Sequence, residues 1–175
     1  MNFEEKTLDS EYKYQSKVID VRYDNVELSD GQKTIRIVVE HPGGVVIVAQ
    51  KTPETILMVK QFRYPIKQTA LELPAGKLEK GEQPFPAAQR ELEEETGYRA
   101  ESWKELGYIN TTPGFCDEKL YLYFATDLKY VGEHPDDGEI ITAEEYKIED
   151  VFNKIKNGEI NDSKTICALT RAYKI

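Results

Sequence analysis

Cysteine and long apolar runs are both scarce in this chain of 175 residues. The two cysteines, Cys116 and Cys167, have a spacing that fits neither a disulfide framework nor a zinc motif. No run approaches the roughly 18 apolar residues of a membrane-spanning helix, and residues 1–10 carry no apolar stretch typical of a secretory signal. We therefore expect a protein of the reducing cytoplasm with no membrane partner.

Positive charge is also in deficit, because 23 lysines and arginines stand against 32 aspartates and glutamates, a formal net charge of −9. A field of this sign repels polyanions, so we expect no nucleic-acid partner. A substrate that carries phosphate would need cations to share its charge. With 39% apolar and 31% charged residues, the chain is neither disordered nor collagen-like. Its length suits one compact domain with a real core, with room for a small appended element.

Strand and turn signals fill the first half of the chain. Residues 18–27 and 33–40 predict an N-terminal β-hairpin, because Asp30-Gly31 between them supplies the positive φ of a hairpin turn. The apolar runs 45–50 and 55–62 predict two buried strands, and residues 70–73 predict a short third one.

Helix signals follow. Pro84 and Pro86 suit the first turn of a helix and Gly97 suits the left-handed position past its end, so residues 87–96 form the helix body. Further strands are expected at 102–111, 119–127 and 139–146, an acidic loop at 129–138, and helices at 148–157 and 162–173. This order predicts an α+β fold in which helices pack on the faces of a mixed sheet, an α/β/α sandwich.

The helix at 87–96 concentrates negative charge on one arc. At about 100° per residue, Glu91, Glu94 and Glu95 lie together, whereas Glu93 lies elsewhere. In a half-buried cleft each like-charged pair would cost roughly 3 kcal/mol at a separation of about 6 Å. A divalent cation would reverse that sign, and carboxylate oxygens are the ligands that Mg²⁺ or Mn²⁺ prefers. The alternative is a solvated acidic face.

The spacing around this helix decides between the two. Gly76 is followed after five residues by Glu82, and after seven more by Arg90-Glu91-Leu92-Glu93-Glu94-Glu95-Thr96-Gly97-Tyr98. This pattern resembles the signature of the Nudix hydrolases at every fixed position. The resemblance implies a Nudix fold and a strand-loop-helix metal site that hydrolyses a nucleoside diphosphate linked to another group.

The resemblance also implies a role for each residue of the signature. Two or three Mg²⁺ ions, with Mn²⁺ as a possible substitute, would be held by Glu91, Glu94, Glu95 and the backbone carbonyl of Ala75. Gly76, Glu82, Arg90 and Gly97 would be structural supports, with Glu82 and Arg90 fixing the loop to the helix.

Several segments resemble the ADP-ribose pyrophosphatase branch of this family. Pro113 follows Gly97 by 16 residues, Arg36 precedes His41-Pro42-Gly43, and Gln61-Phe62-Arg63 is present. Ile37 stands where that branch usually has Glu. The resemblance implies that Arg36 and Arg63 contact adenosine diphosphate, that Tyr14 stacks on adenine, and that the ribose-side pocket is lined by Thr112, Pro113, Gly114 and Glu118. It also implies that residues 1–42 form a β element that acts as the dimerisation arm of a homodimer, and that residues 43–175 form the Nudix hydrolase domain.

The implied reaction is hydrolysis of ADP-ribose to AMP and ribose 5-phosphate by attack of water on one phosphorus of the diphosphate. The family supplies a general base from an acidic loop far downstream of the signature. Asp137 falls on the base position and Glu139 on a further metal-ligand position. Because Asp137 is shorter than the more common Glu, Glu139 is the alternative base. The catalytic candidates are thus Glu95, Asp137 and Glu139.

Other functions remain open at this point. Within the same chemistry the substrate could be a nucleotide sugar or a dinucleoside polyphosphate. From another class, the chain could be a non-catalytic ADP-ribose or NAD-binding sensor, although no carboxylate of the signature is lost. An isomerase on this fold would need a different active site with a catalytic cysteine, and it is disfavoured because Cys116 lies outside the signature.

Overall fold

A computed structural model describes residues 2–132 and 140–174. The chain divides into two compact units. Unit 1 comprises residues 1–43 and 110–119, and unit 2 comprises residues 44–109 and 120–175. No helix in the described ranges is long and apolar enough to cross a membrane.

Unit 1 is built on a small antiparallel sheet. Its strands β1 (Lys6–Gln15), β2 (Asp20–Glu27) and β3 (Lys33–Glu40) pair in chain order. The predicted hairpin is confirmed as β2 and β3, with Gly31 at φ 85° in the turn between them. The sequence missed β1, because every residue of this strand is exposed and its polar sequence carries no apolar alternation.

Unit 2 contains the mixed sheet that the sequence predicts. Its main strands run in the order β10-β5-β4-β9-β8, and β4 pairs with β9 in parallel but with β5 in antiparallel orientation. Two short strands, β6 and β7, pair with β5 and β4. The bounds are β4 Gly44–Thr52, β5 Thr55–Arg63, β6 Gln68–Glu72, β7 Ala75–Lys77, β8 Tyr98–Asn110, β9 Lys119–Tyr130 and β10 Ile141–Lys147, with a 3₁₀ turn η1 at Tyr64–Ile66.

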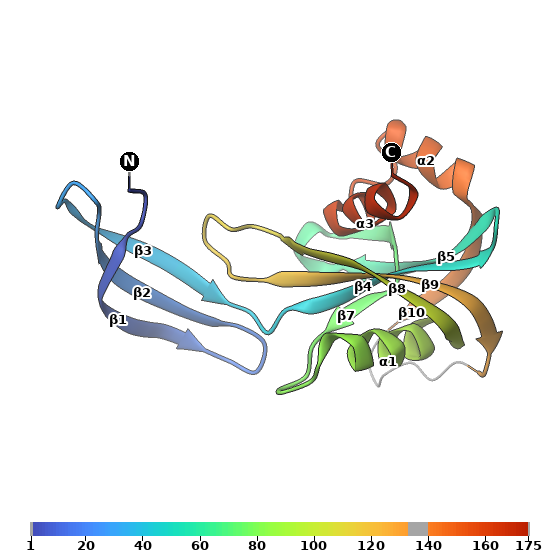
Figure 1. Cartoon of the computed structure of the whole chain (residues 1–175), viewed down its shortest axis with the longest axis horizontal. Helices are drawn as coiled ribbons and strands as arrows, with labels where there is room; N and C mark the ends of the chain where they lie inside the picture. The colour runs from blue at the N-terminus through green and yellow to red at the C-terminus, as the bar shows by residue number, and fades with distance from the viewer. Residues whose placement is uncertain (1, 133–139, 175) are drawn as a thin grey trace. The chain divides into compact units, whose positions relative to one another are not determined.

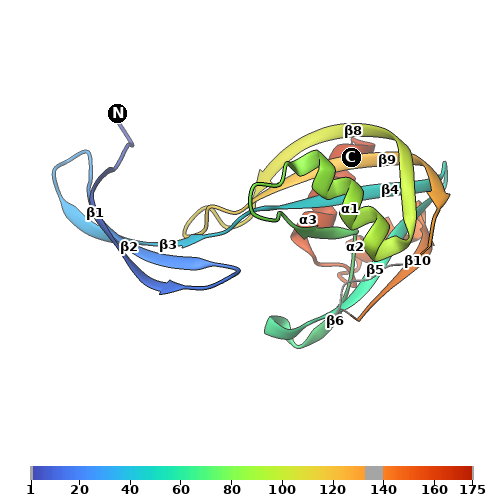
Figure 2. The same cartoon turned by 90° about the horizontal axis from the view of Figure 1, so that it is seen from below.

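Helices cover both faces of this sheet, as expected for an α/β/α sandwich (Figure 1). Helix α1 (Pro84–Thr96) lies on one face, and α2 (Ile148–Lys156) and α3 (Ser163–Tyr173) lie on the other, an arrangement that the second view also shows (Figure 2).

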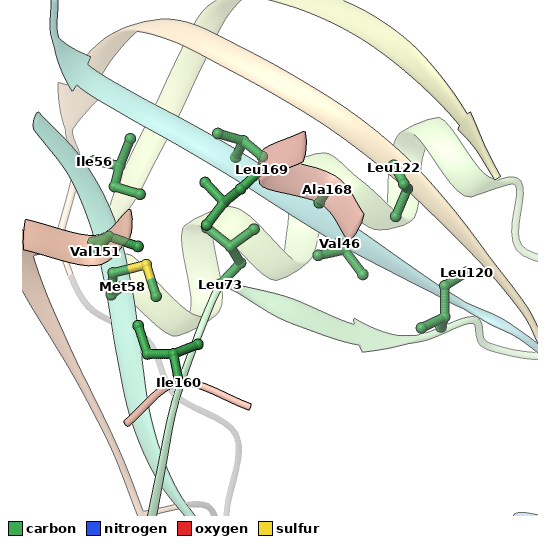
Figure 3. Close-up of a cluster of buried hydrophobic side chains, with 11 residues drawn as sticks. Val46, Ile56, Met58, Leu73, Leu120, Leu122, Val151, Ile160, Ala168 and Leu169 are labelled. Carbon is green, nitrogen blue, oxygen red and sulfur yellow. The ribbon is translucent and has the colours of Figure 1, made fainter. Parts of the chain in front are cut away.

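The apolar run of β4 explains the two layers. Successive side chains of a strand point to opposite faces, so Val46 and Val48 join the core under α2 and α3 whereas Val45 and Ile47 join the core under α1. Figure 3 shows the first of these cores, in which Leu169 of α3 and Val151 of α2 lie over the sheet. A strand buried on both faces needs an uninterrupted apolar sequence.

The ends of several elements differ from those predicted. Helix α1 begins at Pro84 and ends at Thr96. Gly97 follows it as the expected left-handed cap, with a φ of 73° and an N–H that donates to the Glu93 carbonyl. Strand β8 begins four residues earlier than predicted, at Tyr98 rather than 102. Strand β9 continues through Asp127, at φ 56°, to Tyr130, so the predicted loop at 129–138 starts later.

Candidate functional site

The backbone at the start of β7 lies directly against two carboxylates of α1. The N–H of Ala75 donates to Glu95 Oε2 at 2.8 Å. A Cβ on Gly76 would lie 1.9 Å from the Glu91 carboxyl carbon, so only glycine allows this approach. Glu91 and Glu95 lie one helical turn apart, and this spacing brings both carboxylates to the same strand. The fold therefore joins the two halves of the sequence pattern into one site.

Arg90 organises the acidic face of α1. Its Nη1 lies 2.7 Å from Glu94 and 2.9 Å from Glu91, and its Nε and Nη2 each lie 3.0 Å from one oxygen of Glu82. The hydrogen bonds to Glu82, and the charges of Glu91 and Glu94, raise the pKa of the Arg90 guanidinium above its usual value. The same contact with Arg90 lowers the pKa of Glu82. The structure thus brings Glu82 and Arg90 together and ties the loop to the helix.

The donor set of this face suits a hard divalent cation. Among residues 2–132 and 140–174, no three acidic, histidine or cysteine side chains are already gathered around one point. Instead, Glu91 and Glu94 contact Arg90, and Glu95 contacts the Ala75 N–H. Arg90 contacts a third carboxylate, that of Glu82, as well. Glu95 is buried, with 8% of its surface exposed. Partly buried carboxylates beside a backbone strand are the oxygen ligands that Mg²⁺ prefers.

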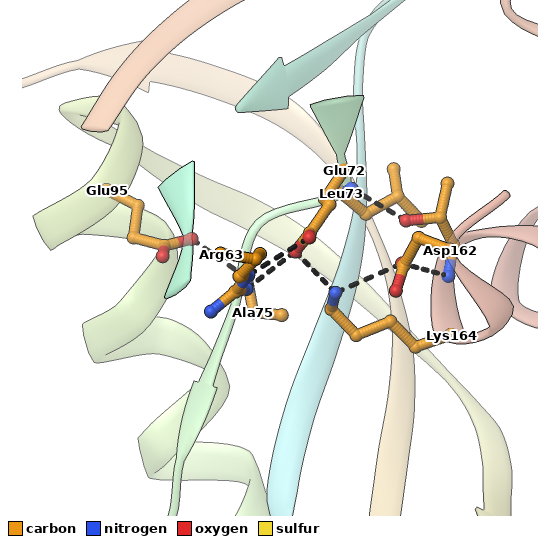
Figure 4. A network of polar contacts seen from close by, with 8 residues as sticks. Arg63, Glu72, Leu73, Ala75, Glu95, Asp162 and Lys164 are labelled. Atoms are coloured by element: carbon orange, nitrogen blue, oxygen red, sulfur yellow. Dashed lines mark hydrogen bonds and ion pairs between the residues drawn. The ribbon is translucent and has the colours of Figure 1, made fainter. Parts of the chain in front are cut away.

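Arg63, at the end of β5, lies beside this face in a second polar network (Figure 4). Its Nε and Nη2 donate to the two oxygens of Glu72 at 3.0 and 2.6 Å. Lys164 of α3 lies 2.5 Å from Glu72 Oε2 and 3.0 Å from Asp162. Burial raises the pKa of Glu72, but the hydrogen bonds and charges of Arg63 and Lys164 outweigh burial and lower it overall. The hydrogen bonds to Glu72 raise the pKa of Arg63.

Sequence reasoning singled out Arg63 but missed Glu72 and Lys164. One signal was available for Glu72, which interrupts the apolar residues Leu71 and Leu73 and is only 3% exposed. A charged residue that is almost fully buried needs a partner of opposite charge. Nothing local pointed to Lys164, because 92 residues separate it from Glu72.

The other expected substrate residues lie in unit 1. Arg36 of β3 makes a two-point contact with Glu5, at 2.7 and 2.8 Å, and Tyr14 of β1 is exposed. The remaining four, Thr112, Pro113, Gly114 and Glu118, lie in one loop.

That loop runs beside the end of β3. The Thr112 carbonyl accepts hydrogen bonds from the N–H groups of Phe115 and Cys116 and closes the turn. The Val39 N–H donates to the Phe115 carbonyl at 2.7 Å. Glu118 lies 3.3 Å from His41 Nδ1. Asp137 and Glu139, the two expected candidates for the base, lie outside the described residues.

Known proteins share sequence with nearly the whole of this chain. Residues 40–169 match the family model of the NUDIX domain, and residues 5–44 match that of the nucleoside diphosphate sugar hydrolase N-terminal domain. The chain is 41% identical over 170 residues to an ADP-ribose pyrophosphatase of Bacillus subtilis (strain 168), covering 96% of this chain and 92% of the relative. It is 42% identical over 169 residues to a methanol dehydrogenase activator of Bacillus methanolicus, covering 95% and 91%.

A solved structure shares the fold. The chain is similar to the crystal structure of an ADP compounds hydrolase with a TM-score of 0.87 and 19% identity, covering 99% of this chain and 95% of the other. At that identity the likeness shows the arrangement of the elements. The α+β fold with a mixed sheet is thereby confirmed.

Proposed function

Because this chain belongs to the Nudix hydrolase family, we propose that it hydrolyses ADP-ribose to AMP and ribose 5-phosphate with a divalent metal ion. The observation that carries the proposal is the packing of the Ala75-Gly76 backbone against Glu91 and Glu95. This packing supports a metal site formed from the two ends of the family signature. The choice of ADP-ribose is supported by the relative of that activity at 41% identity over nearly the whole chain.

The metal site in this proposal holds two or three Mg²⁺ ions, with Mn²⁺ as a substitute. The ligands are Glu91, Glu94, Glu95, the carbonyl of Ala75, and Glu139. Bound divalent ions supply neutralisation of the phosphate charge and activation of the attacking water. Arg90 holds Glu91 and Glu94 in place beforehand, and Gly76 keeps the strand close to the helix.

The chain's other residues bind the substrate and move the proton. Arg63 contacts a phosphate oxygen, which suits its planar fork of donors. Arg36 and Tyr14 bind the adenosine end, and Asp137 or Glu139 accepts the proton of the attacking water. The ribose side is bound by the loop residues Thr112, Pro113, Gly114 and Glu118.

Unit 1 serves in this proposal as the dimerisation arm of a homodimer. Ile35 and Ile37 of β3 are 55% and 50% exposed, and β1 is exposed along its whole length. A three-stranded sheet with this little burial gains stability when a second surface covers it. A second copy of this chain is the occupant that we propose.

The two cysteines are free thiols, which suits a reducing cytoplasm.

The substrate is tested by incubating the purified protein with Mg²⁺ and, separately, ADP-ribose, a nucleotide sugar and a dinucleoside polyphosphate. We expect AMP and ribose 5-phosphate from ADP-ribose, with the highest kcat/KM of the three. Faster cleavage of another substrate would keep the metal chemistry and change the substrate. A folded protein that binds ADP-ribose and cleaves none of the three would instead be a sensor.

A second candidate function is activation of a dehydrogenase, because the relative at 42% identity is named as an activator. The test compares methanol oxidation by a purified methanol dehydrogenase with and without this protein. A higher rate that is lost in Glu95→Gln would support this function and tie it to the same site. An unchanged rate would reject it.

A further inference from the structure

The segment that links β6 to β7 is held at four successive residues. Glu72 contacts Arg63 and Lys164, the Leu73 N–H donates to Thr165 Oγ1 at 2.9 Å, and the Pro74 carbonyl accepts from the Ile47 N–H at 2.9 Å. At the fourth residue, the Ala75 N–H donates to Glu95. Two of these four residues, Glu72 and Leu73, are contacted by the first turn of α3, a helix that the family signature does not include.

Among the residues that the structure describes, Arg63 is held along one edge of its guanidinium. Its Nε and Nη2 share the side of the guanidinium that faces Glu72. Because the group is planar, Nη1 and the second hydrogen of Nη2 are directed away from Glu72. The Arg63 side chain is 38% exposed, and it is close enough to Glu95 for that charge to raise the Arg63 pKa further. The open edge therefore belongs to a guanidinium close to the acidic face of α1.

Lys164 fixes the carboxylate that holds Arg63. Its Nζ lies 2.5 Å from the same Oε2 that accepts the Arg63 Nη2 hydrogen bond. The Glu72 side chain is 4% exposed, so little water reaches it to replace a lost cation. Asp162, the N-cap of α3, contacts Lys164 at 3.0 Å and accepts from the Thr165 N–H. Helix α3 thus supplies one of the two cations that hold the Glu72 carboxylate, and Asp162 holds that cation in place.

We propose that Glu72 and Lys164 are positioning residues, which hold the open edge of Arg63 toward a phosphate group of a bound nucleoside diphosphate. The inference rests on the proposed function, because Arg63 is there the contact to the diphosphate. It adds that affinity for the diphosphate depends on α3. If Glu72 and Lys164 only stabilised the fold, replacing them would lower the melting temperature and leave the affinity for the diphosphate unchanged.

The test measures binding of the α,β-methylene analogue of ADP, which cannot be hydrolysed at its P–C–P bridge, by calorimetry with Mg²⁺. We expect Lys164→Met to raise Kd about tenfold and Arg63→Ala to raise it about 10- to 100-fold, as for loss of a hydrogen bond to a charged group. The double variant is expected to bind no more weakly than Arg63→Ala alone, because both changes remove one interaction. Lys164→Arg is expected to restore Kd to within about threefold.

The matched control is Lys154→Met in α2, which loses an ion pair with Glu159 at 2.6 Å and is expected to leave Kd unchanged. Glu72→Gln supplies a second variant of the same network, with the same expected rise in Kd, in case Lys164→Met does not fold. An unchanged Kd in the folded network variants would overturn the proposal. The proposal would also be overturned if the Kd of the double variant exceeded that of Arg63→Ala by the whole increase measured for Lys164→Met alone.

The outcomes separate this inference from the proposed function. A wild-type protein that binds the analogue with the expected pattern but leaves ADP-ribose intact supports the positioning network and rejects the hydrolase function. If the protein cleaves ADP-ribose but its double variant combines the full Kd increases of both single variants, the positioning network is rejected and the hydrolase function stands. A wild-type protein that does not bind the analogue overturns the positioning network.

Discussion

The two sheets of this chain are stabilised in different ways. In β4 of unit 2, residues Val45 to Ala49 are fully buried between two layers of helices. In β1 of unit 1, every residue is exposed. Burial of apolar surface is the main favourable term in folding, so unit 2 has its own source of stability. Unit 1 buries Val26 of β2, but it relies mainly on backbone pairing and on polar contacts.

The ion pairs of unit 1 do not replace a core. Arg22 contacts Asp24 and Glu40. Arg36 contacts Glu5, and the side chains of this pair are 44% and 35% exposed. Exposed ion pairs contribute about 0–1 kcal/mol each. The comparison teaches that a site needing fixed carboxylates belongs in unit 2, whereas the exposed sheet suits contact with another molecule.

The largest expected effect comes from crowding the site in unit 2. Gly76→Ala places a Cβ 1.9 Å from the Glu91 carboxyl carbon and forces that side chain away from the strand. We expect kcat for ADP-ribose to fall about 10³-fold, equivalent to about 4 kcal/mol. Gly158→Ala is the control, because no atom of the described residues lies within 4 Å of its Cβ position. Because Gly158 has a left-handed backbone, this control should lose about 1 kcal/mol of stability. Full activity in Gly76→Ala would contradict the proposed metal site.

The second effect compares the two units by removing one leucine from each. Leu92→Ala opens a cavity in the core under α1, where this side chain is fully buried, and should lower the free energy of unfolding by about 3–5 kcal/mol. Leu8→Ala on β1 removes a side chain that is 39% exposed and should cost less than about 1 kcal/mol. Urea denaturation measures both changes in the free energy of unfolding. Equal losses in the two variants would contradict the proposed difference between the units.

The third effect concerns the exposed face of unit 1. Ile37→Glu places a charge on a side chain that is 50% exposed in one chain and covered in the proposed dimer. We expect the dimer Kd to rise about 100-fold, or about 2.7 kcal/mol, with the melting temperature of unit 2 unchanged. Sedimentation over a concentration series measures this change. A wild-type protein that is monomeric throughout would reject the arm.

The smallest effect is a pH dependence of stability. Glu72 has a folded pKa below its ordinary value of 4.5, so its contribution is present above about pH 4.5 and is lost as the pH falls through the folded pKa. Glu72→Gln should therefore be less stable than wild type by about 1–2 kcal/mol at pH 7, with a gap that narrows below pH 4.5. Arg36 also lowers the pKa of Glu5, but this pair is exposed to solvent, so the matched change Glu5→Gln should show a smaller gap.

The sequence predicted best those features that have local causes. Pro84 and Gly97 bound α1 because each suits one end of a helix, and the apolar run of β4 reports burial on both faces. Strand β1 was missed because an exposed strand has no apolar side to reveal it. The contact of Lys164 with Glu72 was missed because it is made by the tertiary fold. The roles of Asp137 and Glu139 stay predictions.

In the proposed function, one face of α1 carries the chemistry. Its most direct test is kcat for ADP-ribose with Mg²⁺ in Glu95→Gln and in Glu93→Gln, the same change on the same helix. Glu95 contacts the Ala75 N–H, whereas Glu93 pairs with Arg99. We predict a loss on the order of 10³-fold in Glu95→Gln and less than about threefold in Glu93→Gln. Wild-type activity in Glu95→Gln, or equal losses in both variants, would contradict the claim.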